Sequence, residues 1–169
     1  MGYAVLHIDK ARSNDSGNTA HIARTYTPSN VDPSRTRLNR ELVQFPANVT
    51  NRSEAIEHRI ATAGIYRKVA KNQVKALRFI LSSSPEDMAR IEQEGLLYEW
   101  CDESMDWLRS TFGADNVVAA TLHADEDTPH IHATVVPIVT GERRKAKEEA
   151  ENGKRKYNCL LYTSDAADE

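Results

Sequence analysis

The sequence predicts an α+β fold with an antiparallel β-sheet backed by helices on one side. Three observations indicate it. Residues 3–9 and 74–81 are β-prone, residues 85–112 have helical periodicity, and residues 117–123 and 130–139 are β-prone segments joined by a short connection. A strand, then helices, then a terminal hairpin is an order typical of an antiparallel sheet packed against helices.

The N-terminal part of the chain is expected to contain the first strand, at 3–9, and a short helix. A loop cluster rich in Ser, Asn and Gly follows the strand, and Asn18 or Thr19 can cap the helix after it. We expect this helix to carry His21 and Arg24.

The middle of the chain begins with a turn-rich stretch, residues 27–34, which we expect to be exposed. A helix is predicted from Ser53, because Glu54 and Glu57 fall in its first turns, where the helix dipole favours anions. The second strand, residues 74–81, ends in a run of serines before a proline.

Pro85, followed by two acidic residues, predicts the start of a helical region that reaches Phe112 and ends at Gly113. Its second half carries apolar residues at spacings of three and four, so they form one stripe: Leu97, Cys101, Met105, Leu108 and Phe112. Cys101 is therefore predicted to be a core residue and not a nucleophile.

The two C-terminal strands divide their side chains between an apolar and a polar face, because successive residues of a strand point to opposite sides. Three histidines and two threonines share the polar face: Thr121, His123, His130, His132 and Thr134. The opposite side is apolar and can pack on helices: Val118, Ala120, Leu122, Ile131, Ala133 and Val135.

Three neighbouring imidazoles would repel one another if protonated, and each titrates near neutrality when unperturbed. A divalent cation removes this conflict, because neutral imidazole is a good ligand for first-row metals. His123, His130 and His132 are therefore predicted to bind a metal, and the connection between them holds Asp125 and Glu126 as candidate orienting groups or bases. A surface histidine cluster or a water-bridged network is the alternative.

Composition excludes several classes of protein. The sequence has no run of 18 apolar residues that would span a membrane and no secretory signal pattern. Two cysteines make no disulfide framework, which favours a reducing, cytoplasmic setting.

The net charge of −3 conceals two regions of opposite sign. Residues 20–80 contain eleven Lys or Arg against four Asp or Glu, whereas residues 81–109 contain two basic and eight acidic residues. One basic and one acidic face are expected, which suits a nucleic-acid partner but also fits two solvated surfaces.

The last eleven residues, 159–169, differ in character from the Lys/Arg/Glu-rich stretch before them. The string is similar to a translated sequencing adaptor, so we expect residues 1–158 to form one C-terminally truncated domain and the tail to be an artefact. A genuine short C-terminal segment is the alternative.

The segment from His123 to His132 resembles the third motif of the Mob/Pre (MobV) relaxases, a family of HUH endonucleases. Two further motifs of that family have similar counterparts in order: His21-Ile-Ala-Arg24, and Asp32-Pro-Ser-Arg35 with Leu38-Asn39 and Glu41-Leu42. The resemblance covers residues 3–141 and departs from the family at Asp32, where relatives carry Asn. It implies an HUH relaxase-like fold with the histidines on central strands.

The resemblance also implies an activity: a strand-specific DNA endonuclease that nicks an origin of transfer by transesterification for conjugative mobilisation, with Mn²⁺ or Mg²⁺. The implied nucleophile is His21, which would form a covalent link to the DNA 5′ phosphate, with Glu126 supporting the site. Neutral imidazole needs no strong base near pH 7, unlike a tyrosine of pKa about 10. Tyr26 is the rival nucleophile, and Arg24 would hold a phosphate unless it pairs with an acid.

Single-stranded or hairpin origin DNA is the expected partner, with a coupling protein of a conjugation system as a second one. Basic and polar side chains in and after the second motif are candidate DNA contacts: Arg35, Arg37, Asn39, Arg40, Arg67 and Lys68. Two alternatives remain open, a metal-dependent phosphodiesterase that uses water and a non-catalytic DNA-binding fragment.

Overall fold

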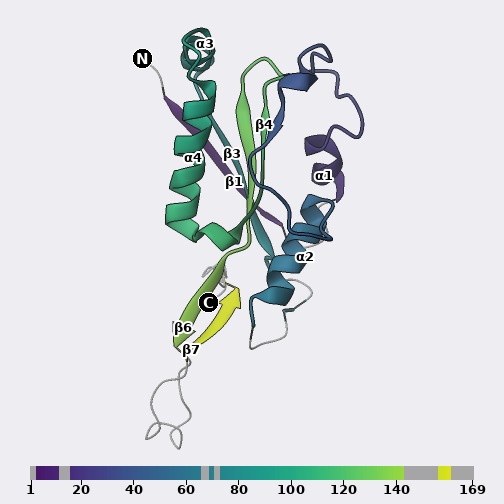
Figure 1. Ribbon diagram of the computed structural model, residues 1–169, viewed down its shortest axis with the longest axis vertical. Helices are drawn as coiled ribbons and strands as arrows, with labels where there is room; N and C mark the ends of the chain where they lie inside the picture. The colour runs from purple at the N-terminus through teal and green to yellow at the C-terminus, as the bar shows by residue number, and fades with distance from the viewer. Residues whose placement is uncertain (1–2, 12–15, 66–68, 71–72, 143–155, 161–169) are drawn as a thin grey trace, which may run out of the picture.

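The computed structural model of the chain describes residues 3–11, 16–65, 69–70, 73–142 and 156–160. Its main element is a five-stranded sheet in the order β1-β3-β5-β4-β2, in which all neighbours are antiparallel (Figure 1). The strands are β1 Ala4–Ala11, β2 Arg40–Glu41, β3 Ala76–Ser83, β4 Val117–His123 and β5 His130–Val135. The predicted α+β class with an antiparallel sheet is confirmed.

Helices lie on both faces of this sheet. The α-helices are α1 Ser16–Ile22, α2 Arg52–Thr62, α3 Pro85–Gln93 and α4 Leu97–Phe112, and two short 3₁₀ helices are η1 Thr36–Leu38 and η2 Ala114–Asn116. Figure 1 shows α3 and α4 on one side of the sheet and α1 and α2 on the other. The expectation that helices cover one side only was wrong, because the polar face is partly covered as well.

Helix α4 packs on the apolar face as its sequence predicts. Cys101, Met105 and Leu108 are at most 2 % exposed, and they join a core that includes Phe79 and Leu122. Leu97 and Phe112, at the two ends of the stripe, are partly buried against the same core. The assignment of Cys101 to the core is confirmed.

The helical region predicted from Pro85 to Phe112 is interrupted at Gly95. This glycine has φ 74°, a left-handed conformation that side chains rarely adopt, so the chain turns there between α3 and α4. Gly113, with φ 90°, then ends α4 as predicted.

A bulge in β4 corrects one predicted face. The register with β5 moves from Val117–Val135 to Ala119–Thr134, so Val118 is the extra residue. Val118 therefore packs with Ala55 and Ile56 of α2 and not with Leu122 on the α4 side, where we had placed it. From Ala119 onward the predicted alternation holds.

The predicted strand at residues 130–139 is two strands. β5 ends at Val135, and β6, Ile138–Glu142, pairs with β7, Lys156–Leu160, in a separate two-stranded sheet. Pro137 lies at the break, and a proline has no backbone N–H to donate to a strand ladder. β7 crosses the domain boundary expected after residue 158, and that boundary stays a prediction.

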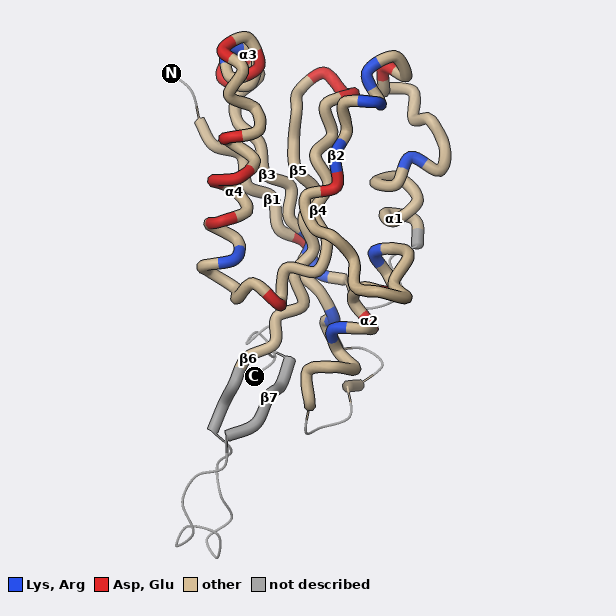
Figure 2. The backbone as a smooth tube through the Cα atoms, in the orientation of Figure 1, with Lys and Arg blue, Asp and Glu red and all other residues tan. Residues whose placement is uncertain are grey.

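The two charge regions lie on different sides of the molecule. Figure 2 shows acidic residues along α3 and α4, and basic residues along α2 and the segment that enters β2. Among the described residues, no helix combines the length and apolar character that crossing a lipid bilayer requires.

Candidate metal and nucleophile site

The three predicted ligand histidines gather where β4 ends and β5 begins. The register pairs His123 with His130 and Thr121 with His132, so the three imidazoles share the polar face at one end of the sheet. Ring centroids are 5.3 Å apart for His123 and His130, and 4.8 Å apart both for His123 and His132 and for His130 and His132. The Nε2 atoms of His130 and His132 are 3.1 Å apart.

His21 joins this cluster from the last turn of α1. Its ring centroid lies 6.1 Å from that of His123 and 5.9 Å from that of His132. Its side chain keeps 29 % exposure, and its Nε2 is 3.9 Å from Oε1 of Glu126. Tyr26 is 54 % exposed, and its ring centroid is 6.4 Å from that of His21. His21 therefore adjoins His123 and His132, and the ring of Tyr26 neighbours that of His21.

Arg24 does not continue the helix of His21, as we had expected. Helix α1 ends at Ile22, and Arg24 has φ 51°, a left-handed conformation that costs a non-glycine residue roughly 1–3 kcal/mol. Because the backbone N–H of Arg24 and that of Thr25 both bond back into α1, the chain reverses and turns the guanidinium toward the sheet.

The Arg24 guanidinium contacts both acids of the connection between β4 and β5. Its Nη2 donates to Oδ1 of Asp125 at 2.7 Å and to Oε1 of Glu126 at 2.6 Å, and its Nε donates to Oδ2 of Asp125 at 3.0 Å. The same Nη2 lies 3.0 Å from Nδ1 of His123. With a side chain only 9 % exposed, Arg24 is a buried cation held by two carboxylates.

Asp125 is fully buried and accepts bonds from several side chains. Besides Arg24, the hydroxyl of Thr36 and the amide of Asn39 donate to its Oδ2, at 3.0 and 2.8 Å. Burial alone would raise the pKa of this carboxyl, but the hydrogen bonds and the charge of Arg24 outweigh burial and lower the pKa to about 2. Asp125 is thus ionised at neutral pH.

Glu126 faces the imidazoles with one oxygen and the exposed loop with the other. Its Oε1 lies 3.6 Å from Nδ1 of His123 and 4.0 Å from Nε2 of His130, and its Oε2 accepts from the amide of Asn30 at 2.8 Å. Burial opposes ionisation, but the hydrogen bond from Arg24 and nearby positive charge lower its pKa below the usual range. A negative carboxylate therefore stands among the histidines.

The buried imidazoles are neutral at pH 7. Burial lowers the pKa of His123 to about 4 and that of His132 to about 2, and in both cases neighbouring positive charge adds to the effect. Nε2 of His123 lies 3.0 Å from the carbonyl of Ile22, and Nδ1 of His130 lies 2.9 Å from the carbonyl of Thr128. A carbonyl only accepts, so these nitrogens carry the protons, leaving lone pairs on Nδ1 of His123 and Nε2 of His130.

Ligand atoms within reach of one ion form two overlapping groups among the described residues. One group joins His21, His123 and His132, and the other joins His123, Glu126 and His130, with all ligand atoms of a group within 4.8 Å of one another. The predicted trio is thus spread over two groups that share His123. Neutral imidazoles with one carboxylate are a donor set that fits a divalent first-row metal.

The second motif braces the connection that carries the acids. Asn39 accepts from the backbone N–H of Ala124 at 2.8 Å with its Oδ1, while its Nδ2 donates to Asp125. Asp32 donates its backbone N–H to the carbonyl of Asp125 at 2.8 Å, and its Oδ1 accepts from the N–H and hydroxyl of Ser34. The Asn39 side chain is therefore directed into the protein.

The arginines predicted to contact DNA are placed differently from one another. Arg35 pairs with Glu92 of α3 at 2.8 Å, and Arg40 lies over the ring of Tyr98 in α4, 4.1 Å from its centroid. Arg37 is exposed. Arg67 and Lys68 lie outside the described residues, and the role of all these residues in DNA binding stays a prediction.

Sequence reasoning missed two contributors to the site. Asn30 and Thr36, which bond to Glu126 and Asp125, lie about 90 residues away from them in sequence. Their distance along the chain left no local signal, since an isolated Asn or Thr in a turn-rich stretch is ordinary.

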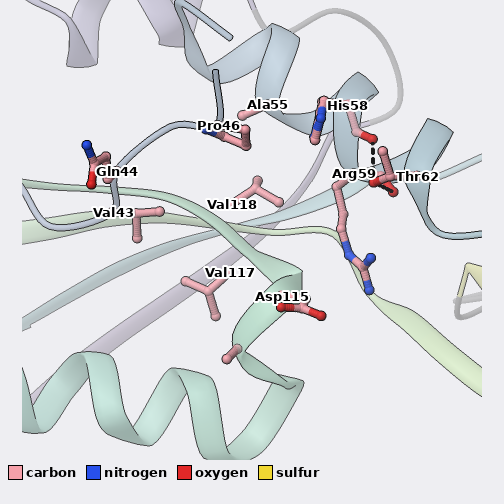
Figure 3. A pocket seen from close by; sticks show the side chains of 11 residues that line it. Val43, Gln44, Pro46, Ala55, His58, Arg59, Thr62, Asp115, Val117 and Val118 are labelled. Atoms are coloured by element: carbon pink, nitrogen blue, oxygen red, sulfur yellow. Dashed lines mark hydrogen bonds between the residues drawn. The ribbon is translucent and has the colours of Figure 1, made fainter. Parts of the chain in front are cut away.

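A cavity of about 400 Å³ lies away from the histidines. Its lining residues come from α2, from residues 43–46 and from residues 114–118, and include His58, Arg59 and Asp115 (Figure 3). The predicted catalytic and metal-binding residues lie elsewhere, at the β4–β5 end of the sheet.

Comparison with known proteins identifies relatives of this chain. The family described as "Plasmid recombination enzyme" (Mob_Pre) matches residues 1–160. A plasmid recombination enzyme type 3 of Staphylococcus aureus is 32 % identical over 162 residues, which are 91 % of this chain and 38 % of that protein. A 65 kDa protein of Zymomonas mobilis is 30 % identical over 137 residues, 80 % of this chain and 23 % of that protein. The chain thus spans less than half the length of these curated relatives.

Solved structures of a relaxase domain have the same fold. The MobM relaxase domain, Mn-bound and in complex with a 22-nucleotide oriT DNA of plasmid pMV158, aligns with a TM-score of 0.74 and 25 % identity, covering 87 % of this chain and 79 % of that one. A complex of the same domain with a 23-nucleotide DNA aligns with a TM-score of 0.67 and 26 % identity, covering 88 % and 74 %.

Proposed function

The chain belongs to the plasmid recombination enzyme family (Mob_Pre), and on that premise we propose that it is the catalytic part of a DNA relaxase. Its reaction would be the nicking of one strand of origin-of-transfer DNA by transesterification, with His21 as the nucleophile. One observation carries this proposal: the His21 ring lies about 6 Å from two of the three clustered histidines and keeps an exposed edge.

The nucleophilic step forms a bond between phosphorus and a ring nitrogen of His21 and breaks the bond from phosphorus to the 3′ oxygen. A neutral imidazole attacks with its lone pair, the ring's N–H proton is then released, and the departing 3′ oxygen takes up one proton and leaves as a hydroxyl. Glu126 is the nearby carboxylate, 3.9 Å from Nε2, and a small shift would bring it into hydrogen-bond reach. It can hold the proton of one ring nitrogen and so leave the other for attack.

Arg24 acts in this proposal as a positioning residue. It holds Asp125 and Glu126 in place from a strained backbone conformation, and its Nη1 lies 3.5 Å from Nε2 of His21. Our sequence interpretation had assigned its guanidinium to a DNA phosphate, with pairing to an acidic residue as the alternative. The two carboxylates now account for most of its donors, which favours positioning of the carboxylates over direct DNA contact.

The donor set of the site, which is mainly imidazole, suits a divalent first-row cation such as manganese, and magnesium, which prefers oxygen ligands, is the second candidate. His123, His130 and His132 remain the proposed ligands, with Glu126 and His21 beside them in the two groups of ligand atoms. When bound, such a cation would withdraw charge from the non-bridging oxygens of the scissile phosphate. The MobM relaxase domain, the solved structure aligned above, is Mn-bound.

Origin-of-transfer DNA, single-stranded or in a hairpin, is the proposed substrate, because the MobM domain is bound to oriT DNA. Arg35, Arg37, Arg40, Arg67 and Lys68 remain candidate contacts to its backbone, and Asn39 a weaker one. A coupling protein of a conjugation system is a further proposed partner. Plasmid DNA is held in the bacterial cytoplasm, where we place the reaction.

Labelled single-stranded oligonucleotides that tile the DNA upstream of the gene test this proposal. They are incubated with the protein and Mn²⁺ and analysed on a denaturing gel. We expect a covalent protein–DNA adduct that disappears in His21→Ala and persists in Tyr26→Phe. Nicking without an adduct would instead identify a hydrolase that uses water, and binding without nicking would identify a DNA-binding fragment.

A further inference from the structure

The cavity between α2 and the start of β4 has no part in the reaction proposed above. Its volume of about 400 Å³ is in the range of sites that bind small organic groups. Its lining combines apolar side chains, among them Val43, Pro46 and Val118, with the charged side chains of Arg59 and Asp115 (Figure 3). Apolar walls with a few polar groups at fixed positions are the usual features of a site for a partly polar ligand.

We propose that this cavity binds an unstacked guanine base of the DNA strand, with Arg59 and Asp115 as the groups that recognise the base. The inference rests on the proposed function and adds to it a base-specific contact away from the scissile phosphate. Neither residue was a candidate site residue in the sequence. A guanine held here would fix the register of the strand relative to His21.

Arg59 of α2 is held in place by a buried asparagine. Its Nε and Nη2 donate to Oδ1 of Asn116 at 3.1 and 2.9 Å, and Asn116 is 6 % exposed. The Asn116 amide is fixed in turn, because its Nδ2 donates to the carbonyls of Phe112 and Ile138 at 2.7 and 2.8 Å. Within the described part of the chain no carboxylate pairs with Arg59, so its Nη1 is available as a donor to a ligand.

Asp115 supplies an acceptor to the same cavity. It precedes Asn116 in η2, so the short helix that fixes Arg59 also places the Asp115 carboxylate. Both side chains line the cavity, Arg59 from α2 and Asp115 from η2 (Figure 3). Asp115 is exposed, and among the described residues its carboxylate has no hydrogen bond or ion pair. Both carboxylate oxygens can therefore accept bonds from a ligand.

A guanidinium and a carboxylate in one cavity match the edges of guanine better than those of the other DNA bases. Guanine offers the acceptors O6 and N7, which are the commonest base contacts of arginine. Its N1–H and its N2 amino group are adjacent donors, so both oxygens of Asp115 can accept from it. No other DNA base has two adjacent N–H donor atoms. The apolar side chains of Val43 and Pro46 can contact the faces of the ring, as in sites that read an unstacked base.

The cavity lies on the same side of the sheet as the histidines and is connected to them by β4. Val118 in its lining packs with Ala55 of α2, and His123 ends the same strand five residues later. Five residues of a strand span about 17 Å, a length that a few nucleotides can bridge. Figure 2 shows basic residues along α2 and the segment that enters β2, which suits a DNA backbone passing from the cavity to His21.

Equilibrium binding of three single-stranded oligonucleotides tests the guanine contact without needing the origin sequence. They are oligo(dT)₁₂ and two versions of it in which a central base is guanine or hypoxanthine, the base of deoxyinosine. Fluorescence anisotropy is measured with EDTA present to prevent cleavage. We expect the wild-type protein to bind the guanine oligonucleotide roughly tenfold more tightly than oligo(dT)₁₂, as for one good bidentate contact. The deoxyinosine oligonucleotide, which lacks the N2 amino group, should have an intermediate affinity.

Two variants separate the two contacts. Asp115→Ala should bind the guanine and deoxyinosine oligonucleotides equally, because the carboxylate that accepts from the N2 amino group is gone. Arg59→Gln should lower the preference of both for binding over oligo(dT)₁₂. Asp106→Ala and Arg90→Gln are the matched controls, since these side chains are 81 % and 64 % exposed on α4 and α3, and both should keep the wild-type base preference. Circular dichroism and thermal melting confirm folding, and Asp115→Ala, at an exposed position, serves if Arg59→Gln does not fold.

Calorimetric titration with dGMP distinguishes a base in DNA from a free nucleotide. Binding of dGMP that is lost in Asp115→Ala, without a base preference among the oligonucleotides, would assign the cavity to a free nucleotide and overturn the contact to DNA. A guanine preference that persists in folded Asp115→Ala would also overturn the inference, as would equal wild-type affinity for all three oligonucleotides. These results leave the proposed function intact, whereas a wild-type protein that binds none of the oligonucleotides would overturn both.

Discussion

The two faces of the five-stranded sheet are made by the same strands and have opposite chemistry. On the α4 side, Phe79, Leu122 and Ile131 are at most 1 % exposed and pack against the helix. On the other side the sheet presents His123, His130 and His132: His130 bonds to His132 and to the carbonyl of Thr128, and His123 bonds to the carbonyl of Ile22 at the end of α1. The apolar face stabilises the fold, and the polar face holds a set of neutral imidazoles and ionised carboxylates.

The residues that stabilise the fold and the residues of the candidate site therefore lie on opposite faces of the same strands. Every second residue of β4 and β5 can change on one face with little effect on the other, because the alternation directs the side chains apart. The polar face contains features that are costly in free energy: Arg24 has a strained backbone conformation, and its buried charge needs carboxylate partners. Substitutions on the two faces should therefore differ in how they change the free energy of unfolding and its dependence on pH.

The largest loss of stability is expected on the apolar face. Leu108→Ala should lower the free energy of unfolding by about 3 kcal/mol, because Leu108 is fully buried against the sheet and its truncation leaves a cavity. Urea denaturation checks this value, with Trp107→Ala, at a position 42 % exposed, as the control. Leu108→Ala and Trp107→Ala with equal effects would show that α4 does not pack as described.

An acid-sensitive loss of stability is expected on the polar face. His123 has a pKa of about 4 in the folded protein, mainly because it is buried, against about 6.5 when unfolded. As pH falls through this window the unfolded state takes up the proton first, so the stability present above pH 6.5 is progressively lost toward pH 4. For His123 alone the loss should reach about 2.5 kcal/mol by pH 4.5.

Urea denaturation at several pH values between 7 and 4.5, with EDTA present, measures this loss. His123→Gln should make the free energy of unfolding depend less steeply on pH, whereas Leu108→Ala should lower the free energy of unfolding by a similar amount at every pH. A wild-type profile that is flat, or that rises as the solution becomes acidic, would contradict the buried neutral imidazoles.

The smallest effect is expected where the second motif braces the acidic connection. Asn39→Ala should lower the free energy of unfolding by about 1 kcal/mol, because it removes bonds to Ala124 and Asp125 while Arg24 and Thr36 still satisfy the carboxylate. Arg37→Ala, an exposed neighbour, should leave stability unchanged. A variant Asn39→Ala with wild-type stability but weakened DNA binding would restore Asn39 as a DNA contact.

The sequence was most informative where periodicity decides the structure. The stripe around Met105, the strand 117–123 and the shared face of the three histidines follow from spacings of three, four and two residues. The bulge at Val118 has no such signal, because one inserted residue leaves the apolar pattern of the strand intact.

The end of α1 was equally hidden in the sequence. Arg24 lies three residues after His21, a spacing that fits one helical turn, whereas in the structure the chain reverses there and the Arg24 guanidinium bonds to Asp125 and Glu126, which are about 100 residues away along the chain. The hydrogen bond from Arg52 to Thr134 was hidden for the same reason, since the two residues are 82 apart along the chain.

Peptide mapping of the covalent adduct is the most direct test of the central claim that His21 is the nucleophile beside the three histidines. Trypsin separates the two candidates, because cleavage after Arg24 leaves His21 in the peptide 13–24 and Tyr26 in the peptide 25–35. We predict that the DNA phosphate is found on the peptide 13–24 and is released by mild acid, as a phosphoramidate would be. An acid-stable adduct on the peptide 25–35 would contradict the account.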